Sequence, residues 1–237
     1  MFKIRKILNV KKVEDYNLIR IGRLYDGGYL MLNNFNPKQI AYSFGINDDV
    51  SWDKDISTRQ IHCYMYDHTI HQLPCGENQF FHWSKTGVCG NTPQKDCKTI
   101  KQLLESNGHI NKNDLILKMD VEGAEWDVLD DIDFSILRKF DQIVIELHHI
   151  CNLSNYERMI RCLNKLQTTH QAIWVHGNNY SDYLKVGNLI TPDTLEVLFA
   201  NKEKYQFTQN NNQFPLTQDF PNNPEKLDIY LGKWNVD

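Results

Sequence analysis

Acidic and histidine side chains follow three of the apolar runs of this sequence. Asp120 comes directly after Leu115–Met119, Glu146 and His148 stand at the end of a second run, and His176 follows a third. Residues two apart on a strand share a face, so Glu146 and His148 are expected to point the same way. Carboxylate and imidazole groups that meet at one place can move protons or bind a divalent metal.

A glycine and an acidic residue follow two earlier apolar runs. Gly45 comes directly after Ile40–Phe44, and Asp67 follows Ile61–Tyr66, 22 residues after Gly45. A glycine there lets the backbone approach a ligand closely. An acidic residue at that distance is placed to hold the hydroxyls of a ribose, although Asp67 could also serve as a helix cap or turn residue. The G-x-G-x-x-G spacing of dinucleotide-binding proteins is missing.

The elements that position these residues are predicted from short apolar runs that alternate with helical stretches. Several runs are apolar throughout, which is typical of strands buried on both faces of a parallel sheet. Alternating strands and helices predict βαβ units. The seven predicted strands are 40–44, 61–66, 79–82, 115–119, 142–147, 172–175 and 195–200, and the predicted helices are 53–59, 97–106, 122–129 and 156–166.

The expected fold is an α/β fold with about seven strands in a mainly parallel sheet. In such sheets ligands bind beyond the carboxyl ends of the strands. One domain over residues 1–237 is predicted, with an N-terminal extension (1–39) that packs on the site. Residues 201–237 are read as a polar loop closed by a short strand, Leu227–Leu231, and a lid over the site is a further reading of this segment.

The composition excludes several classes of protein. The 237 residues carry a net charge of −4, whereas a general nucleic-acid binder would normally be basic. No run of about 18 apolar residues is present, so no membrane span is expected, and the N-terminus does not resemble a secretory signal. Six cysteines without a Cys-x-x-Cys pair are read as reduced thiols. We therefore expect a cytoplasmic protein.

The run Lys118–Leu129 (Lys-Met-Asp-Val-Glu-Gly-Ala-Glu-Trp-Asp-Val-Leu) resembles the signature of the FkbM-type methyltransferases. Tyr42–Asp53 is similar to the first motif of a related branch of methyltransferase-like proteins. The resemblance extends from about residue 20 to the C-terminus. Shorter segments that also resemble that branch are Asp26–Tyr29, Glu146–His148, His176–Asn178 and Asp219–Asn222.

This resemblance implies a three-layer, Rossmann-like class I methyltransferase fold whose seven-stranded, mainly parallel sheet has an antiparallel late strand. It also implies S-adenosylmethionine as cofactor. Gly45 would approach the amino-acid part of the cofactor and Asp67 its ribose, while Asp120 would flank the sulfonium. The segment that contains Ser84 would lie near the adenine, and Asp48 or Asp49 could contact the amine. The full set of implied cofactor-binding residues is Gly45, Asp48, Asp49, Asp67, Ser84 and Asp120.

Methyl transfer to a hydroxyl requires a group that takes the hydroxyl proton. We expect His148 to be this base because the ordinary pKa of histidine is about 6.5, with Glu146 or Asp120 orienting or stabilising it and His176 at the same rim. Alternatively, Asp120, Glu146 and His148 bind a divalent metal that lowers the pKa of the hydroxyl, a reading that we favour less. For His149 and one other histidine, an ordinary structural hydrogen bond is the competing interpretation.

The function that this reading favours is an S-adenosylmethionine-dependent O-methyltransferase acting on a small molecule. By family analogy the acceptor is a carbohydrate, namely a sugar or nucleotide-activated sugar in the biosynthesis of a surface polysaccharide. Two alternatives are a nicotinamide-dependent oxidoreductase and a catalytically silent, methyltransferase-like binding subunit. The missing glycine fingerprint counts against the first.

Overall fold

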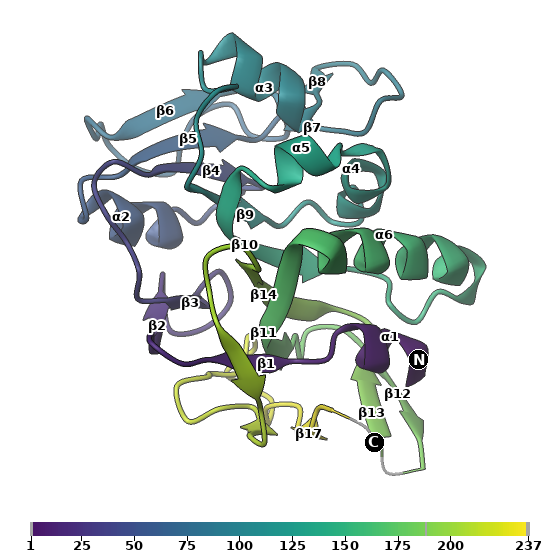
Figure 1. Cartoon of the computed structure of the whole chain (residues 1–237). Helices are drawn as coiled ribbons and strands as arrows, with labels where there is room; N and C mark the ends of the chain where they lie inside the picture. The colour runs from purple at the N-terminus through teal and green to yellow at the C-terminus, as the bar shows by residue number, and fades with distance from the viewer. Residues whose placement is uncertain (1, 188, 236–237) are drawn as a thin grey trace.

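A seven-stranded sheet forms the centre of the computed structural model, which describes residues 2–187 and 189–235 (Figure 1). The strand order is β11-β14-β10-β9-β4-β5-β6. Six strands are parallel, and β14 runs antiparallel between β10 and β11, which confirms the predicted fold class. The strands are β4 (Ile40–Phe44), β5 (His62–Tyr66), β6 (Phe81–Ser84), β9 (Leu115–Met119), β10 (Phe140–Leu147), β11 (His170–Gly177) and β14 (Leu195–Asn201).

The two central strands β9 and β10 are buried along their whole length. Both read as nearly continuous apolar runs because helices or loops cover both faces of the sheet. Lys118 is the charged exception in β9, and its Nζ donates a hydrogen bond of 2.6 Å to the backbone oxygen of Gly45. The buried ammonium group is therefore hydrogen-bonded at the end of the neighbouring strand.

The helices lie on both sides of this sheet. Figure 1 shows α4, α5 and α6 together on one side, and α2 with the β2–β3 hairpin on the other. Helix α4 begins three residues later than predicted, because Glu122 (φ 53°) and Gly123 (φ 105°) form a turn in left-handed conformations that a right-handed helix does not contain. The helices are α1 (Phe2–Ile7), α2 (Ser51–Ser57), α3 (Ile100–Ser106), α4 (Glu125–Asp131), α5 (Phe134–Leu137) and α6 (Tyr156–Thr169), with a 3₁₀ turn at Leu153–Asn155.

Within the described residues, five pairs of short strands lie around the sheet. The strand predicted at Leu227–Leu231 is wrong: this segment has no strand, Leu227 is 94% exposed, and the short strand follows at Gly232–Lys233. The predicted helix at 97–106 also begins later, because Cys97–Lys98 pairs as a strand. The pairs are β1 (Lys11–Val13) with β15 (Phe207–Gln209), β2 (Leu18–Ile21) with β3 (Tyr29–Leu32), β7 (Gly87–Val88) with β8 (Cys97–Lys98), β12 (Tyr183–Val186) with β13 (Leu189–Pro192), and β16 (Gln213–Phe214) with β17 (Gly232–Lys233).

The N-terminal helix is tied to the C-terminal tail. The buried guanidinium of Arg5 donates to the backbone oxygens of Leu231, Lys233 and Trp234, and it stacks 4.3 Å from the ring of Trp234. The two ends of the chain therefore stabilise each other across the molecule. In the described part of the chain, no helix combines the length and the hydrophobicity that a membrane crossing requires.

Candidate functional site

A pocket of about 440 Å³ opens at the carboxyl ends of β4, β5 and β9. Gly45 follows β4, Asp67 follows β5 and Asp120 follows β9, and all three line this pocket. After β4 the chain builds β5 on one side of that strand, and it later returns to place β9 on the other side. The pocket therefore lies at the switch point of the sheet, where open α/β sheets bind ligands. We call it the switch-point pocket.

Gly45 brings the ends of β4 and β9 together. Its φ is +78°, and a Cβ atom at this position would stand 1.6 Å from the backbone oxygen of Asp120. Only a residue without a side chain tolerates both the conformation and this close approach. Gly45 thus allows the two strand ends to come into contact, and it also lines the pocket.

Asp67 holds the loop that follows β4. Its Oδ2 accepts hydrogen bonds of 2.9 Å from the backbone N–H groups of Ile46 and Asn47, and its Oδ1 accepts from the backbone and hydroxyl of Thr69. Burial opposes the charged form, but these hydrogen bonds outweigh it and lower the pKa of Asp67. Four donors already engage the carboxylate, and the Thr69 hydroxyl is the one that can rotate away.

The two acidic residues after β4 differ in their surroundings. Asp49 accepts from the backbone and hydroxyl of Ser51, and its Oδ2 lies 3.4 Å from Nε of Arg23. Asp48 is exposed on the pocket wall. The Asp49 carboxylate is therefore engaged within the protein, whereas the Asp48 side chain is exposed on the pocket wall.

Ser84 lies at the end of β6, beside the switch-point pocket. Its hydroxyl is 2.9 Å from that of Thr86, and its backbone oxygen accepts from the N–H of Asp67. Ser84 is not among the described residues that line the pocket, whereas Gly87 and Val88 are. The structure thus brings five of the six predicted cofactor-binding residues into the wall, and Ser84 stands behind it.

The wall of the switch-point pocket is acidic. Six carboxylates line it against two cationic side chains, Arg23 and Lys118. Arg23 is paired with Asp49, and Lys118 donates to a backbone oxygen. An excess of negative charge suits a ligand that carries positive charge, and it disfavours a pyrophosphate. S-adenosylmethionine, with its sulfonium and amine, matches this donor set. The acidic residues are Asp26, Asp48, Asp49, Asp67, Asp120 and Glu122.

A second pocket of about 430 Å³ adjoins the first. Asp26, Asp120 and Glu122 line both pockets, so they form the wall between them. The second pocket is otherwise polar, and we call it the acceptor pocket. Its remaining lining residues are Glu146, His148, Asn178, Tyr180, Ser181 and Thr194.

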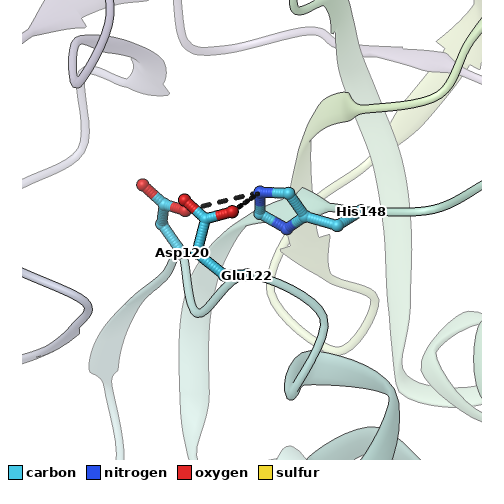
Figure 2. A group of neighbouring side chains, drawn as sticks. All are labelled: Asp120, Glu122 and His148. Carbon is cyan, nitrogen blue, oxygen red and sulfur yellow. Dashed lines mark ion pairs between the residues drawn. The ribbon is translucent and has the colours of Figure 1, made fainter. Parts of the chain in front are cut away.

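His148 is fixed in the wall of the acceptor pocket by a buried carboxylate. The Oε1 atom of Glu125 accepts a 2.7 Å hydrogen bond from the backbone N–H of His148 and lies 3.3 Å from its Nδ1. Burial opposes a charged imidazole, but Glu125, Glu146 and Asp120 outweigh it and raise the pKa of His148 to about 9. Figure 2 shows that the opposite ring nitrogen, Nε2, faces Asp120 and Glu122.

Glu146 is buried beside His148, as the strand alternation predicts. Asn178 donates a 2.6 Å hydrogen bond to its Oε1, and the Tyr29 hydroxyl bridges its Oε2 and Oδ2 of Asp120, at 3.3 Å from each. Burial, with the nearby carboxylates of Asp120 and Glu196, raises the pKa of Glu146 well above its usual value. Asp120, Glu146 and His148 are therefore brought together.

His176 lies behind the acceptor pocket and is not among its lining residues. Its Nδ1 is 2.9 Å from Glu196, and its Nε2 is 3.0 Å from Asp228. Asn222 donates to both Glu196 and Asp26, which links the C-terminal tail to the pocket wall. Both ring nitrogens of His176 are thus engaged by carboxylates of the protein, and the structure does not bring it into the pocket with Asp120, Glu146 and His148.

Three residues that complete the site were not predicted from the sequence as site residues. Tyr29 comes from the β2–β3 hairpin, Asn178 follows β11, and Glu125 is the first residue of α4. The first two lie in short segments that carry the family resemblance, Asp26–Tyr29 and His176–Asn178. That resemblance could have indicated them as site residues. Glu125 does bind a backbone N–H, that of Gly123, but it also holds His148.

The sheet order and the pocket at its switch point define a Rossmann-like α/β protein. The family model for the methyltransferase FkbM domain matches residues 12–174, which is more than half of the chain. The chain therefore belongs to the FkbM methyltransferase family, as the resemblance predicted. The match includes Gly45, Asp67, Asp120 and His148, and it ends before His176. A comparison with curated proteins gave no significant match.

Proposed function

We propose that this protein is an S-adenosylmethionine-dependent O-methyltransferase whose acceptor is a hydroxylated small molecule of the carbohydrate class. The observation that carries the proposal is the common wall of the two pockets. A cofactor in the switch-point pocket and an acceptor in the adjoining pocket meet at Asp26, Asp120 and Glu122. Methyl transfer needs such an arrangement because the two reacting groups must be held in line.

The residues that would hold the cofactor follow from the pocket wall. Asp67 would bind the ribose, with a ribose hydroxyl taking the place of the Thr69 hydroxyl at Oδ1. Asp48, the exposed one of the acidic pair, would face the amine, and Gly87 and Val88 would flank the adenine. Asp120 would stand beside the sulfonium, which supplies the methyl group and a positive charge that a carboxylate stabilises.

The acceptor hydroxyl must give up a proton as its oxygen forms the new bond to the methyl carbon and the sulfur–carbon bond breaks. Two side chains that line the acceptor pocket can take this proton in their unprotonated forms: the His148 imidazole and the Glu146 carboxylate. Because the pKa of His148 is raised to about 9 and that of Glu146 is also raised, turnover through either base should increase as the pH rises. Both are held in position, His148 by Glu125 and Glu146 by Asn178. A positioned proton acceptor accelerates such a step by about 10²–10⁴-fold.

The polar lining of the acceptor pocket supports a carbohydrate acceptor. The Asn178 amide, which has a second N–H beyond its bond to Glu146, and the Thr194 hydroxyl line this pocket, and Tyr180 is 57% exposed. Amide and hydroxyl groups pair with sugar hydroxyls, and an exposed aromatic ring can cover the apolar face of a sugar. A nicotinamide dinucleotide fits less well, because six carboxylates line the pocket that its pyrophosphate would enter.

Methyl transfer from labelled S-adenosylmethionine to a panel of sugars and nucleotide sugars tests the proposal. We expect turnover by the native protein, and a loss of about 10²–10⁴-fold in the variant whose missing side chain is the proton acceptor, His148→Gln or Glu146→Gln. S-adenosylhomocysteine should bind both variants as it binds the native protein. Cofactor binding without turnover on any acceptor would instead indicate the silent binding subunit.

A further inference from the structure

The wall between the two pockets carries a set of atoms that suits a metal ion. Asp120 directly follows β9, Glu122 stands two residues later, and His148 directly follows β10. Two carboxylate oxygens and one imidazole nitrogen from these residues lie within 4.8 Å of one another. Figure 2 shows both carboxylates turned toward the same ring nitrogen.

The Nε2 atom of His148 faces these carboxylates without a hydrogen bond to any described residue. It lies 3.5 Å from Oε2 of Glu122, 3.8 Å from Oδ1 of Asp120 and 3.9 Å from Oε1 of Glu146. These separations exceed the roughly 2.7–3.2 Å of an N–H···O hydrogen bond. His148 as a residue is only 6% exposed, and its Nε2 atom stands at ion-pair distance from these oxygens without a hydrogen bond to them.

The same separations fit ligands of one cation. Ligand atoms at about 2.1 Å from an octahedral ion stand about 3 Å apart when adjacent and about 4.2 Å apart when opposite. The nitrogen–oxygen distances to Glu122 and Asp120 fall between these limits. The side chain of Glu122 is 87% exposed and can therefore adjust to an ion without disturbing the core.

Glu125 supplies the support that a metal-binding histidine requires. It is fully buried, its Oε1 lies 3.3 Å from Nδ1 of His148, and its Oε2 accepts from the N–H of Gly123. A carboxylate on one ring nitrogen orients the other toward a metal and increases its basicity. Glu125 thus aims Nε2 at Asp120 and Glu122.

We propose that Asp120, Glu122 and His148 bind a divalent cation of the Mn²⁺ class on the wall between the two pockets. Two carboxylates and one imidazole suit Mn²⁺, and water or acceptor hydroxyls complete its coordination. Resting on the proposed function, the cation selects acceptors with two neighbouring hydroxyls, which can chelate it, and it lowers the pKa of the bound hydroxyl. His148 is then a ligand, which leaves Glu146 to take the proton.

A second acidic group nearby provides the competing location. Oxygens of Asp26, Glu146 and Glu196 also lie within 4.8 Å of one another. The amide of Asn222 already donates to Asp26 and Glu196, at 3.0 Å and 2.6 Å, and Asn178 donates to Glu146. Because protein donors engage all three, we place the cation at the histidine-containing group.

Calorimetric titration of the chelator-treated full chain with Mn²⁺ tests this site. We expect one Mn²⁺ per chain, at least tenfold weaker binding by Glu122→Gln and by Asp120→Asn, and unchanged binding by Glu105→Gln, an exposed control on α3. Glu122→Gln alters an exposed side chain and should fold normally. No Mn²⁺ binding by the native chain, or native-like binding by Glu122→Gln, overturns the proposal, as does loss of binding confined to Asp26→Asn.

The two proposals fail in different ways. If Mn²⁺ binds as expected but S-adenosylhomocysteine does not, the metal site stands and the methyltransferase function is wrong. If S-adenosylhomocysteine binds and methyl transfer proceeds in a chelator, with no Mn²⁺ bound, the function stands and the metal site is wrong. When both stand, Mn²⁺ should restore the turnover that the chelator removes.

Discussion

Some side chains at the strand ends both stabilise the protein and line the pockets. Asp67 fixes the loop after β4 through two backbone N–H groups while lining the switch-point pocket. His148 is fixed by Glu125 on one ring nitrogen, faces Asp120 and Glu122 with the other (Figure 2), and lines the acceptor pocket. The residues that we assign to binding are therefore also those that keep the pocket in shape.

Asp67→Ala should weaken binding of S-adenosylhomocysteine by at least about tenfold. Hydrogen bonds to a charged group contribute about 1.5–3 kcal/mol, and the variant removes those that hold the N–H groups of Ile46 and Asn47 as well as the ribose acceptor. Calorimetry measures the change, with the exposed Asp15→Ala as control. Native-like affinity in a folded Asp67→Ala protein would show that Asp67 has no part in the site.

The elements that could be predicted are those set by local pattern. The bounds of β4 and β9 agree with prediction because a continuous apolar run ends at a glycine or an acidic residue in each case. The meeting of Asp120, Glu146 and His148 followed from strand ends and alternation. The contacts of the Tyr29 hydroxyl with Asp120 and Glu146 could not be predicted, because they form through the packing of segments that are distant in the sequence. The strand placed at Leu227–Leu231 was wrong because its apolar residues do not all pack inward.

Gly45→Ala should disrupt the contact between β4 and β9. The new Cβ would meet a backbone oxygen at 1.6 Å, so we expect a loss of at least about 4 kcal/mol in the free energy of unfolding, or no folded protein. Gly108→Ala is the matched control: its φ is +71°, but no atom lies within 4 Å of the added Cβ. That variant should lose only about 1–2 kcal/mol.

Urea denaturation compares the two glycine variants. A similar loss of unfolding free energy in both would mean that conformation alone explains Gly45. In that case the close approach of the two strand ends would add nothing measurable to the need for glycine at position 45.

At the scale of the whole molecule, one edge of the sheet carries both pockets and segments from both ends of the chain reach it. Tyr29 comes from the N-terminal hairpin, and Asn222 comes from the C-terminal tail. The rest of the sheet is a packed core whose stability can be measured independently of the site. His170, at the start of β11, belongs to this core and is buried with its Nε2 3.0 Å from the Phe140 backbone oxygen.

Acid should destabilise the fold through His170. Burial, assisted by Lys202 and Lys204 against the Phe140 hydrogen bond, lowers its pKa to about 4, whereas an unfolded histidine has a pKa of about 6.5. The unfolded chain therefore binds the proton first as the pH falls. The stability that neutral His170 contributes is fully present above pH 6.5 and is lost between about pH 6.5 and 4.

Urea denaturation at pH 7 and pH 5 measures this effect. The native protein should lose about 2 kcal/mol more than His170→Gln over this interval, because glutamine has no titrating group. Equal losses in the two proteins would show that His170 is not held neutral in the core.

The central claim is that a nucleoside with a positively charged sulfur binds where Gly45, Asp67 and Asp120 meet. Calorimetric titration with S-adenosylhomocysteine, the product that shares all the proposed contacts except those of the methyl group and the charge, tests it most directly. We expect one ligand per chain, and no binding of a nicotinamide dinucleotide. Absence of binding at about 1 mM S-adenosylhomocysteine, corresponding to less than about 4 kcal/mol of affinity, would contradict the account.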